Sequence, residues 1–214
     1  MDMIASRGEV GGFETPILVI SWRRPKAVIQ VIESLRRLAP SQLYLAGDGP
    51  REGHEGDAGQ GQITRKVVDA AIYWPYQVLQ SYSNSNQGCK YGPSNALSWF
   101  FENVSEGIIP KEDFLPHDSF YSYCCSLLER YRNGTRVWQI SGNNFLDDQR
   151  FGDGNYFFGD FTTALVWATL RHNWPADEQL FTSLYQKPLK DTEKLRLEIL
   201  QALRGIKWKI KIKL

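Results

Sequence analysis

Charged side chains follow three apolar runs of this chain, and their chemistry suits a phosphate group or a divalent cation. They are Arg23 and Arg24 after the run 16–22, Asp48 after the run 42–46, and Lys111, Glu112 and Asp113 after the run 108–109. Guanidinium and ammonium groups offset the charge of a diphosphate. Carboxylates are ligands that Mg²⁺ or Mn²⁺ takes together with phosphate oxygens. Together these groups could bind a diphosphate and its metal ion.

Each of these groups also has an ordinary explanation when it is taken alone. Glu112 and Asp113 suit an exposed acidic turn, and Asp48 lies in a Gly-Asp-Gly-Pro turn. Arg24 is less easily explained, because it precedes Pro25, a residue type that often begins helices. Cations at a helix N-terminus oppose the helix macrodipole, so an anionic ligand would account for arginines at this place.

The elements that must position these groups alternate between strands and helices, which predicts an α/β fold with a mostly parallel central sheet covered by helices on both faces. Strands are expected at 16–22, 42–46, 76–80, 108–109 and 137–141, and helices at 25–39, around 67–72, at 93–104 and at 120–131. A glycine-rich surface loop is expected over 51–61. Ligands of such sheets bind at the carboxyl ends of the strands, so the charged residues should meet at one edge.

The alternation loosens after residue 142. A polar loop over 143–154 is followed by an expected strand at 156–158, an apolar helix at 162–170 and a helix at 191–204. Lysine then alternates with Trp, Ile or Leu over 207–214, which predicts a strand with all its lysines on one face. This tail suits an edge strand protected from aggregation or, alternatively, a basic anchor in peripheral contact with an anionic membrane.

Composition limits the class of protein. The chain has 214 residues and a formal net charge of +1, which predicts one globular domain and no general attraction for nucleic acid. Its cysteines, Cys89, Cys124 and Cys125, are odd in number and two are adjacent, which favours a reducing compartment over a disulfide framework. The first residues lack the pattern of a signal peptide, so a cytoplasmic location is expected.

Several stretches, in order and at similar spacing, resemble bacterial family-2-like nucleotide-diphospho-sugar transferases of the GT-A fold. They are 15–20, 24–25, 43–51, 86–89, 99–102, 106–109, 113–116, 119–120 and 140–145, and the resemblance extends from about Thr15 to Trp174. The chain is also similar, more distantly, to N-acetylglucosaminyltransferase I. The resemblance implies a single Rossmann-like GT-A domain. It would comprise a flexible N-terminus (1–14), a nucleotide-sugar-binding half (15–145) and an acceptor-side half with a C-terminal helix and basic tail (146–214).

The resemblance implies an inverting glycosyltransferase that moves a sugar from a nucleotide-diphosphate sugar to an acceptor hydroxyl. A UDP-sugar is favoured as the donor, the acceptor is an unknown glycan, lipid or protein, and the cofactor is Mn²⁺ or Mg²⁺. Asp113 would hold the metal, and Asp177 and Glu178 lie where the catalytic base is expected. His117 follows Asp113 closely and is expected to begin a helix, with a role as second metal ligand as the alternative.

The same resemblance implies which residues bind the donor. Arg24 would contact the diphosphate, and Asp48 would accept a hydrogen bond from the base. Asn86 and Lys90 are expected in the loop after the third strand, where Lys90 can add charge. Glu112 would hold the ribose hydroxyls.

Lys111 departs from the family's Glu-Asp-Asp motif, because it stands where the first acid is expected. It either contacts phosphate directly or marks a catalytically silent GT-A-like domain that binds only a nucleotide or a partner protein. A nucleotidyltransferase is a weaker alternative, because the stretch after the first strand lacks a glycine-rich phosphate loop.

Overall fold

A computed structural model describes residues 12–74, 77–134, 136–143, 156–159, 165–174 and 211–212. The described strands of the main sheet are β1 (Ile17–Ser21), β2 (Gln42–Gly47), β3 (Gln77–Tyr82), β4 (Glu106–Pro110), β5 (Ile140–Ser141) and β7 (Val166–Leu170). The described α-helices are α1 (Pro25–Arg36), α2 (Asp57–Ala71), α3 (Gly88–Asn103) and α4 (Asp118–Tyr131). A short 3₁₀ turn, Arg171–Asn173, follows β7. The predicted α/β class is confirmed.

The main sheet has the strand order β3-β2-β1-β4-β7-β5. Strands β1 to β4 run parallel to one another, whereas β7 runs antiparallel to both β4 and β5. The sheet is therefore mostly parallel, as predicted. Strands from before and after the predicted boundary at residues 145 and 146 belong to this one sheet, because β7 pairs with β4 and with β5.

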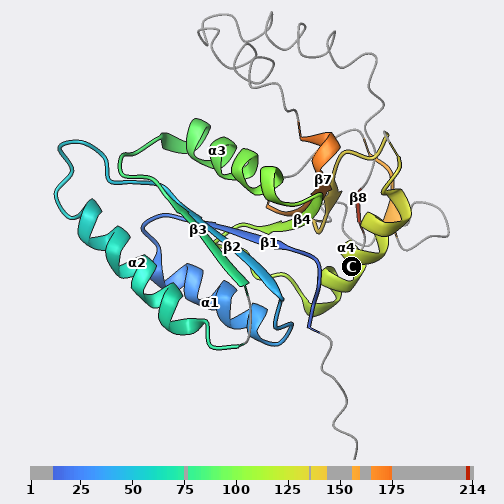
Figure 1. Cartoon of the computed structure of the whole chain (residues 1–214), viewed down its shortest axis with the longest axis horizontal. Coiled ribbons are helices and arrows are strands. Elements are labelled where there is room, and N and C mark those ends of the chain that lie inside the picture. The colour runs from blue at the N-terminus through green and yellow to red at the C-terminus, as the bar shows by residue number, and fades with distance from the viewer. Residues whose placement is uncertain are drawn as a thin grey trace, which may run out of the picture.

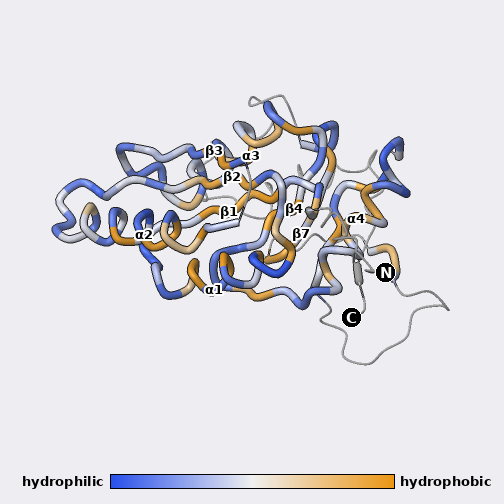
Figure 2. Tube along the Cα trace, turned by 60° about the horizontal axis from the view of Figure 1, so that its bottom comes forward, coloured by the Kyte–Doolittle hydropathy of each residue, from blue (hydrophilic) through white to orange (hydrophobic). Residues whose placement is uncertain are grey.

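Helices cover both faces of this sheet (Figure 1). Alternate residues of β1 point to opposite faces. Ile17 and Val19 join the apolar cluster that contains the inner faces of α1, α2 and α4, and Leu18 joins the cluster beneath α3. Figure 2 shows the hydrophobic stretches of β1 and β2 in the middle of the molecule and hydrophilic segments along the outer turns of the helices. Burial on both faces explains why β1 and the middle of β2 have continuous apolar sequences.

Helix α1 illustrates how the local sequence builds the frame of the site. Pro25 occupies the first helical turn, and the apolar side chains that follow at helical spacing are fully buried against the sheet. They are Val28, Val31, Ile32 and Leu35. The helix therefore fixes the position of Arg24, whose carbonyl accepts hydrogen bonds from the backbone N–H groups of Ala27 and Val28.

Four sequence-based expectations need correction. The helix expected at 162–170 is wrong, because Val166–Leu170 forms strand β7. The loop expected over 51–61 ends early, since α2 begins at Asp57. Helix α3 begins at Gly88 instead of residue 93, so Cys89 and Lys90 lie in its first turn and not in the preceding loop. The strand expected over 137–141 is shorter than predicted and comprises only Ile140–Ser141.

A second, two-stranded sheet pairs β6 (Tyr156–Phe157) antiparallel with β8 (Lys211–Ile212). The strand expected at the C-terminal tail is therefore confirmed for those two residues. The helix expected at 191–204 and the rest of the tail lie outside the described residues.

Candidate functional site

The candidate site lies where the chain changes direction across the sheet. From β1 the chain adds β2 and then β3 on one side, and β4 then pairs with the opposite side of β1. The loop after β1 leads into α1 and toward β2, whereas the loop after β4 leads into α4 and toward β5 and β7, so the two loops separate along the sheet although α1 and α4 cover the same face. Open α/β sheets bind ligands in the crevice at such a switch point. Residues 22–24 follow β1 here, and residues 111–113 follow β4.

Two cations and one carboxylate meet at this switch point. Arg24 donates from Nη1 to Oδ2 of Asp113 at 2.7 Å, and Nζ of Lys111 lies 3.4 Å from Oδ1 of the same carboxylate. The side chains of Arg24 and Lys111 remain 59% and 49% exposed. Exposed ion pairs of this kind contribute about 0–1 kcal/mol each, so a ligand can replace them at little cost.

Glu112 joins the loop after β4 to the loop after β1. Its Oε2 accepts a hydrogen bond from the backbone N–H of Trp22 at 3.0 Å, and its Oε1 lies 3.6 Å from Nε of Arg24. Burial raises the pKa of Glu112, while the Trp22 N–H and the Arg24 guanidinium oppose that shift. The carboxylate is thus held in a fixed place between the two loops that border the switch point.

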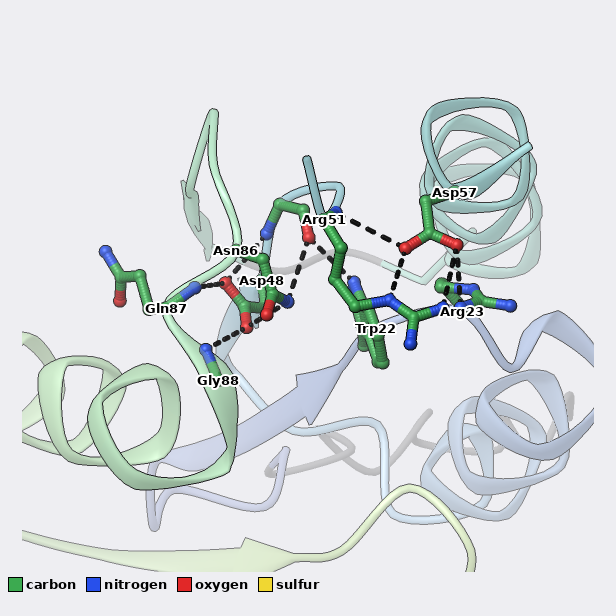
Figure 3. A network of polar contacts seen from close by, with 9 residues as sticks. Trp22, Arg23, Asp48, Arg51, Asp57, Asn86, Gln87 and Gly88 are labelled. Atoms are coloured by element: carbon green, nitrogen blue, oxygen red, sulfur yellow. Dashed lines mark hydrogen bonds and ion pairs between the residues drawn. The ribbon is translucent and has the colours of Figure 1, made fainter. Parts of the chain in front are cut away.

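Asp48 is surrounded by hydrogen-bond donors from its own chain (Figure 3). Oδ1 accepts from the N–H groups of Gly49 (2.8 Å) and Gln87 (2.7 Å). Oδ2 accepts from Nδ2 of Asn86 (2.8 Å) and the N–H of Gly88 (3.0 Å). The carboxylate therefore ties the end of β2 to the first turn of α3. The role of Asp48 in binding a base stays a prediction, and the observed contacts give it a structural role.

A second ion-pair group, beside the first, contains Arg23, Arg51 and Asp57. Arg23 Nη1 lies 2.7 Å from Oδ1 of Asp57, and Arg51 donates from Nε to Oδ2 at 2.8 Å. The Asp57 side chain is only 3% exposed. The hydrogen bond from Arg51 lowers the pKa of Asp57 to about 2, with the nearby charges of Arg23 and Arg51 acting in the same direction.

Trp22 connects this group with the hydrogen-bond network around Asp48 (Figure 3). Its indole N–H donates to the carbonyl of Gly49 at 2.9 Å, and the guanidinium carbons of Arg23 and Arg51 lie 4.9 and 5.3 Å from the centre of its ring. Cation–π contacts of this length are attractive. Sequence reasoning missed Arg51 and Asp57 as members of this network. Their types and positions gave no signal, because both residues fall in the stretch 51–61 that was predicted to be a surface loop.

The other predicted site residues lie in several places. Asn86 donates from Nδ2 to Asp48 and also to the carbonyl of Gly49. Lys90 packs its ammonium 4.7 Å from the ring centre of Tyr91. His117 is the N-cap of α4, where its Nδ1 accepts from the N–H of Ser119, as expected for a helix-start residue. Asp177 and Glu178 lie outside the described residues.

The residues at Asp113 do not fit a divalent cation. Each of its oxygens already faces a side-chain cation, because Arg24 lies at Oδ2 and Lys111 lies at Oδ1. A metal ion bound to Asp113 would come close to both Arg24 and Lys111, and like charges at such distances repel. Within the described part of the chain, no three His, Cys, Asp or Glu side chains gather into a metal-binding group. The mechanism proposed below is therefore argued from the side-chain cations of this chain and derives no step through Mn²⁺ or Mg²⁺.

Comparison of the chain with models of protein families and with curated proteins found no match. None of the helices in the described ranges is both long and apolar enough to cross a membrane.

Proposed function

We propose that this chain is a glycosyltransferase that uses a nucleotide-diphosphate sugar, with a UDP-sugar as the favoured donor. The observation that carries the proposal is the meeting of Arg24, Lys111, Glu112 and Asp113 at the switch point between β1 and β4. This is the place where an α/β sheet of this order binds its ligand. The sequence resemblance to the GT-A transferases supports the sugar nucleotide as the ligand class.

The proposed roles follow from the contacts of each residue. Arg24 and Lys111 are held by exposed ion pairs, so they can turn from Asp113 to the diphosphate oxygens. Glu112 offers carboxylate oxygens to the ribose hydroxyls close to the Trp22 backbone. The loops around Trp22 and Asp48 would enclose the base.

The reaction would be a direct displacement at the anomeric carbon. The acceptor oxygen forms a bond to that carbon while the bond from carbon to the nucleoside diphosphate breaks, and a carboxylate takes the proton of the acceptor hydroxyl. Positive side chains stabilise the charge that develops on the departing diphosphate. Asp177 or Glu178 is the proposed base, the acceptor is a hydroxyl of a glycan, lipid or protein, and the proposed location is the cytoplasm.

A second candidate function is a silent domain that binds the nucleotide without transferring the sugar. The observation that favours it is Lys111, whose ammonium lies 3.4 Å from Asp113 in a place where the resemblance predicts an acid. Binding and turnover therefore have to be measured separately.

The test is titration of the full chain with UDP, GDP, ADP and UMP, followed by incubation with UDP-sugars while released UDP is measured. We expect a nucleoside diphosphate to bind at least tenfold more tightly than UMP. Arg24→Gln should weaken that binding at least tenfold, and the control Lys66→Gln, an exposed lysine of α2, should leave it unchanged. Binding without UDP release from any sugar nucleotide would support the silent domain. Absence of binding to all diphosphates would contradict both candidates.

A further inference from the structure

We propose that Lys111 and Arg24 bind the diphosphate directly and make its binding independent of divalent cations. The inference rests on the proposed function, because it concerns the same site and the same ligand class. It goes further by assigning to two side chains of this chain the charge that a metal ion would otherwise supply.

The geometry brings the two cations together on one carboxylate. Arg24 Nη1 lies 2.7 Å from Oδ2 of Asp113, and Lys111 Nζ lies 3.4 Å from Oδ1. Asp113 therefore holds the guanidinium and the ammonium on its two oxygens, which keeps both close together in spite of their mutual repulsion. A diphosphate also presents oxygens that can accept from both groups, so it can take the place of this carboxylate without large movements of the cations.

The charges of the cluster agree with this role. Lys111 and Arg24 together balance Glu112 and Asp113, so the four side chains have no net charge. An acid in place of Lys111 would change the net charge of the group from zero to minus two. One bound divalent cation would be needed to balance that charge. With a lysine at position 111, the four side chains are already neutral without a bound metal ion.

The backbone keeps both side chains in place while leaving their ends free to move. The N–H of Lys111 donates to the carbonyl of Leu165 at 3.1 Å, and its carbonyl accepts from the N–H of Phe114 at 3.1 Å. Lys111 also forms an isolated parallel bridge with Ile20 of β1. Arg24 is fixed as the N-cap of α1. Because these bonds are made by the backbone, a change of the Lys111 side chain leaves them intact.

The test compares UDP affinity in EDTA with affinity in Mn²⁺ or Mg²⁺, by titration calorimetry of the full chain. We expect the parent protein to bind UDP equally well, within about twofold, in both conditions. Lys111→Asp should weaken binding at least tenfold in EDTA and should regain affinity when Mn²⁺ is added. Lys111→Arg, which keeps the positive charge, should lose less UDP affinity in EDTA than Lys111→Asp, and the charge-reversal control Lys66→Asp on α2 should have no effect on either value.

Each outcome decides the question. If the parent binds UDP at least tenfold more weakly in EDTA, the inference is wrong while the proposed nucleotide site stands. If Lys111→Asp is folded by circular dichroism and binds UDP in EDTA as tightly as the parent, Lys111 does not contact the diphosphate, and Lys111→Gln provides the same test without an added acid. If no nucleoside diphosphate binds the parent in either condition, the proposed function and the inference fail together.

Discussion

Asp57 is a buried carboxylate at the first position of α2, held by arginines from two loops. Arg23 comes from the end of β1 and Arg51 from the segment after β2, so the three side chains join three parts of the chain. The pKa of Asp57 is lowered to about 2 from its ordinary value of 3.8, chiefly by the hydrogen bond from Arg51. The folded protein therefore keeps this carboxylate ionised at a pH where the unfolded chain takes up a proton.

This shift predicts how stability depends on pH. The contribution of Asp57 should be complete above about pH 4 and should be lost as the pH falls toward about 2, because the unfolded chain binds more protons in that window. Asp57→Asn should lower stability at neutral pH and should flatten the dependence between those values. Urea unfolding from pH 2.5 to 7 measures both effects.

The control for Asp57→Asn is Glu33→Gln, an isosteric change of an exposed acid on α1. Its unfolding curve should follow that of the parent protein at each pH. If the Asp57→Asn protein is as stable as the parent at pH 7, the ion pairs of Asp57 with Arg23 and Arg51 do not stabilise the fold.

Asp48 supports a second prediction at the scale of one residue. Its four donors include the N–H groups of Gln87 and Gly88, at the start of α3. Asp48→Ala should leave these donors without an acceptor and lower the free energy of unfolding by about 1–3 kcal/mol. If Asp48 also contacts a base, the ratio of UDP to GDP affinity should fall as well. Denaturant unfolding tests the structural role, and titration with both nucleotides tests the role in base binding.

The residue types of the site could be predicted from the sequence, but their pairing could not. Strand ends of a parallel sheet lie at one edge, so the placement of Arg24, Asp48 and Asp113 after the carboxyl ends of their strands follows from the order of the elements. Which cation each carboxylate takes depends on side-chain positions of a few ångströms. Arg24 was expected to meet a ligand and is bound to Asp113, while Arg51 and Asp57 were not expected to take part.

Two elements differ from the sequence prediction for physical reasons. Pro93 favoured a helix beginning at its own position, but Asp48 accepts from the N–H groups of Gln87 and Gly88 and thereby starts α3 earlier. Strand β7 was expected to be helical because its sequence is apolar without clear alternation. It lies between β4 and β5, so pairing with segments distant in sequence decides its conformation.

The contact between α3 and β4 supports a prediction at the scale of elements. Gly107 of β4 is packed beneath Phe100 of α3, and a Cβ added there would overlap the aromatic ring. Gly107→Ala should therefore lower the free energy of unfolding by about 1–3 kcal/mol, the usual cost of overpacking a core. Thermal and urea unfolding of the purified protein measure this change.

Gly61 provides the matched control. It lies inside α2, and an added Cβ meets nothing within 4 Å. Gly61→Ala should stabilise the protein by about 0.5–1 kcal/mol, because alanine loses less backbone entropy in a helix. If both substitutions change the free energy of unfolding by the same amount in the same direction, an added Cβ at Gly107 does not disturb the packing of Phe100.

At the scale of the whole molecule, strand β7 joins the two sequence regions into one sheet. It pairs with β4, which leads into the candidate site, and with β5, which follows α4. The N–H of Lys111 donates to the carbonyl of Leu165, the residue before β7, so the loop at Lys111 is joined to this strand by its backbone. The candidate site and the described strands β5 and β7 therefore belong to one sheet.

The C-terminal tail carries the last prediction, because β8 (Lys211–Ile212) is the antiparallel partner of β6 (Tyr156–Phe157). Truncation after Gly205 removes β8, and the resulting loss of strand pairing should lower the melting temperature by about 2–4 °C for each kcal/mol of stability lost. Neither form should bind anionic vesicles if the tail serves as an edge strand. In the opposite result, the full chain sediments with such vesicles at low salt, and the truncated chain stays in solution and is equally stable. That result would assign the alternating lysines over 207–213 to a membrane contact.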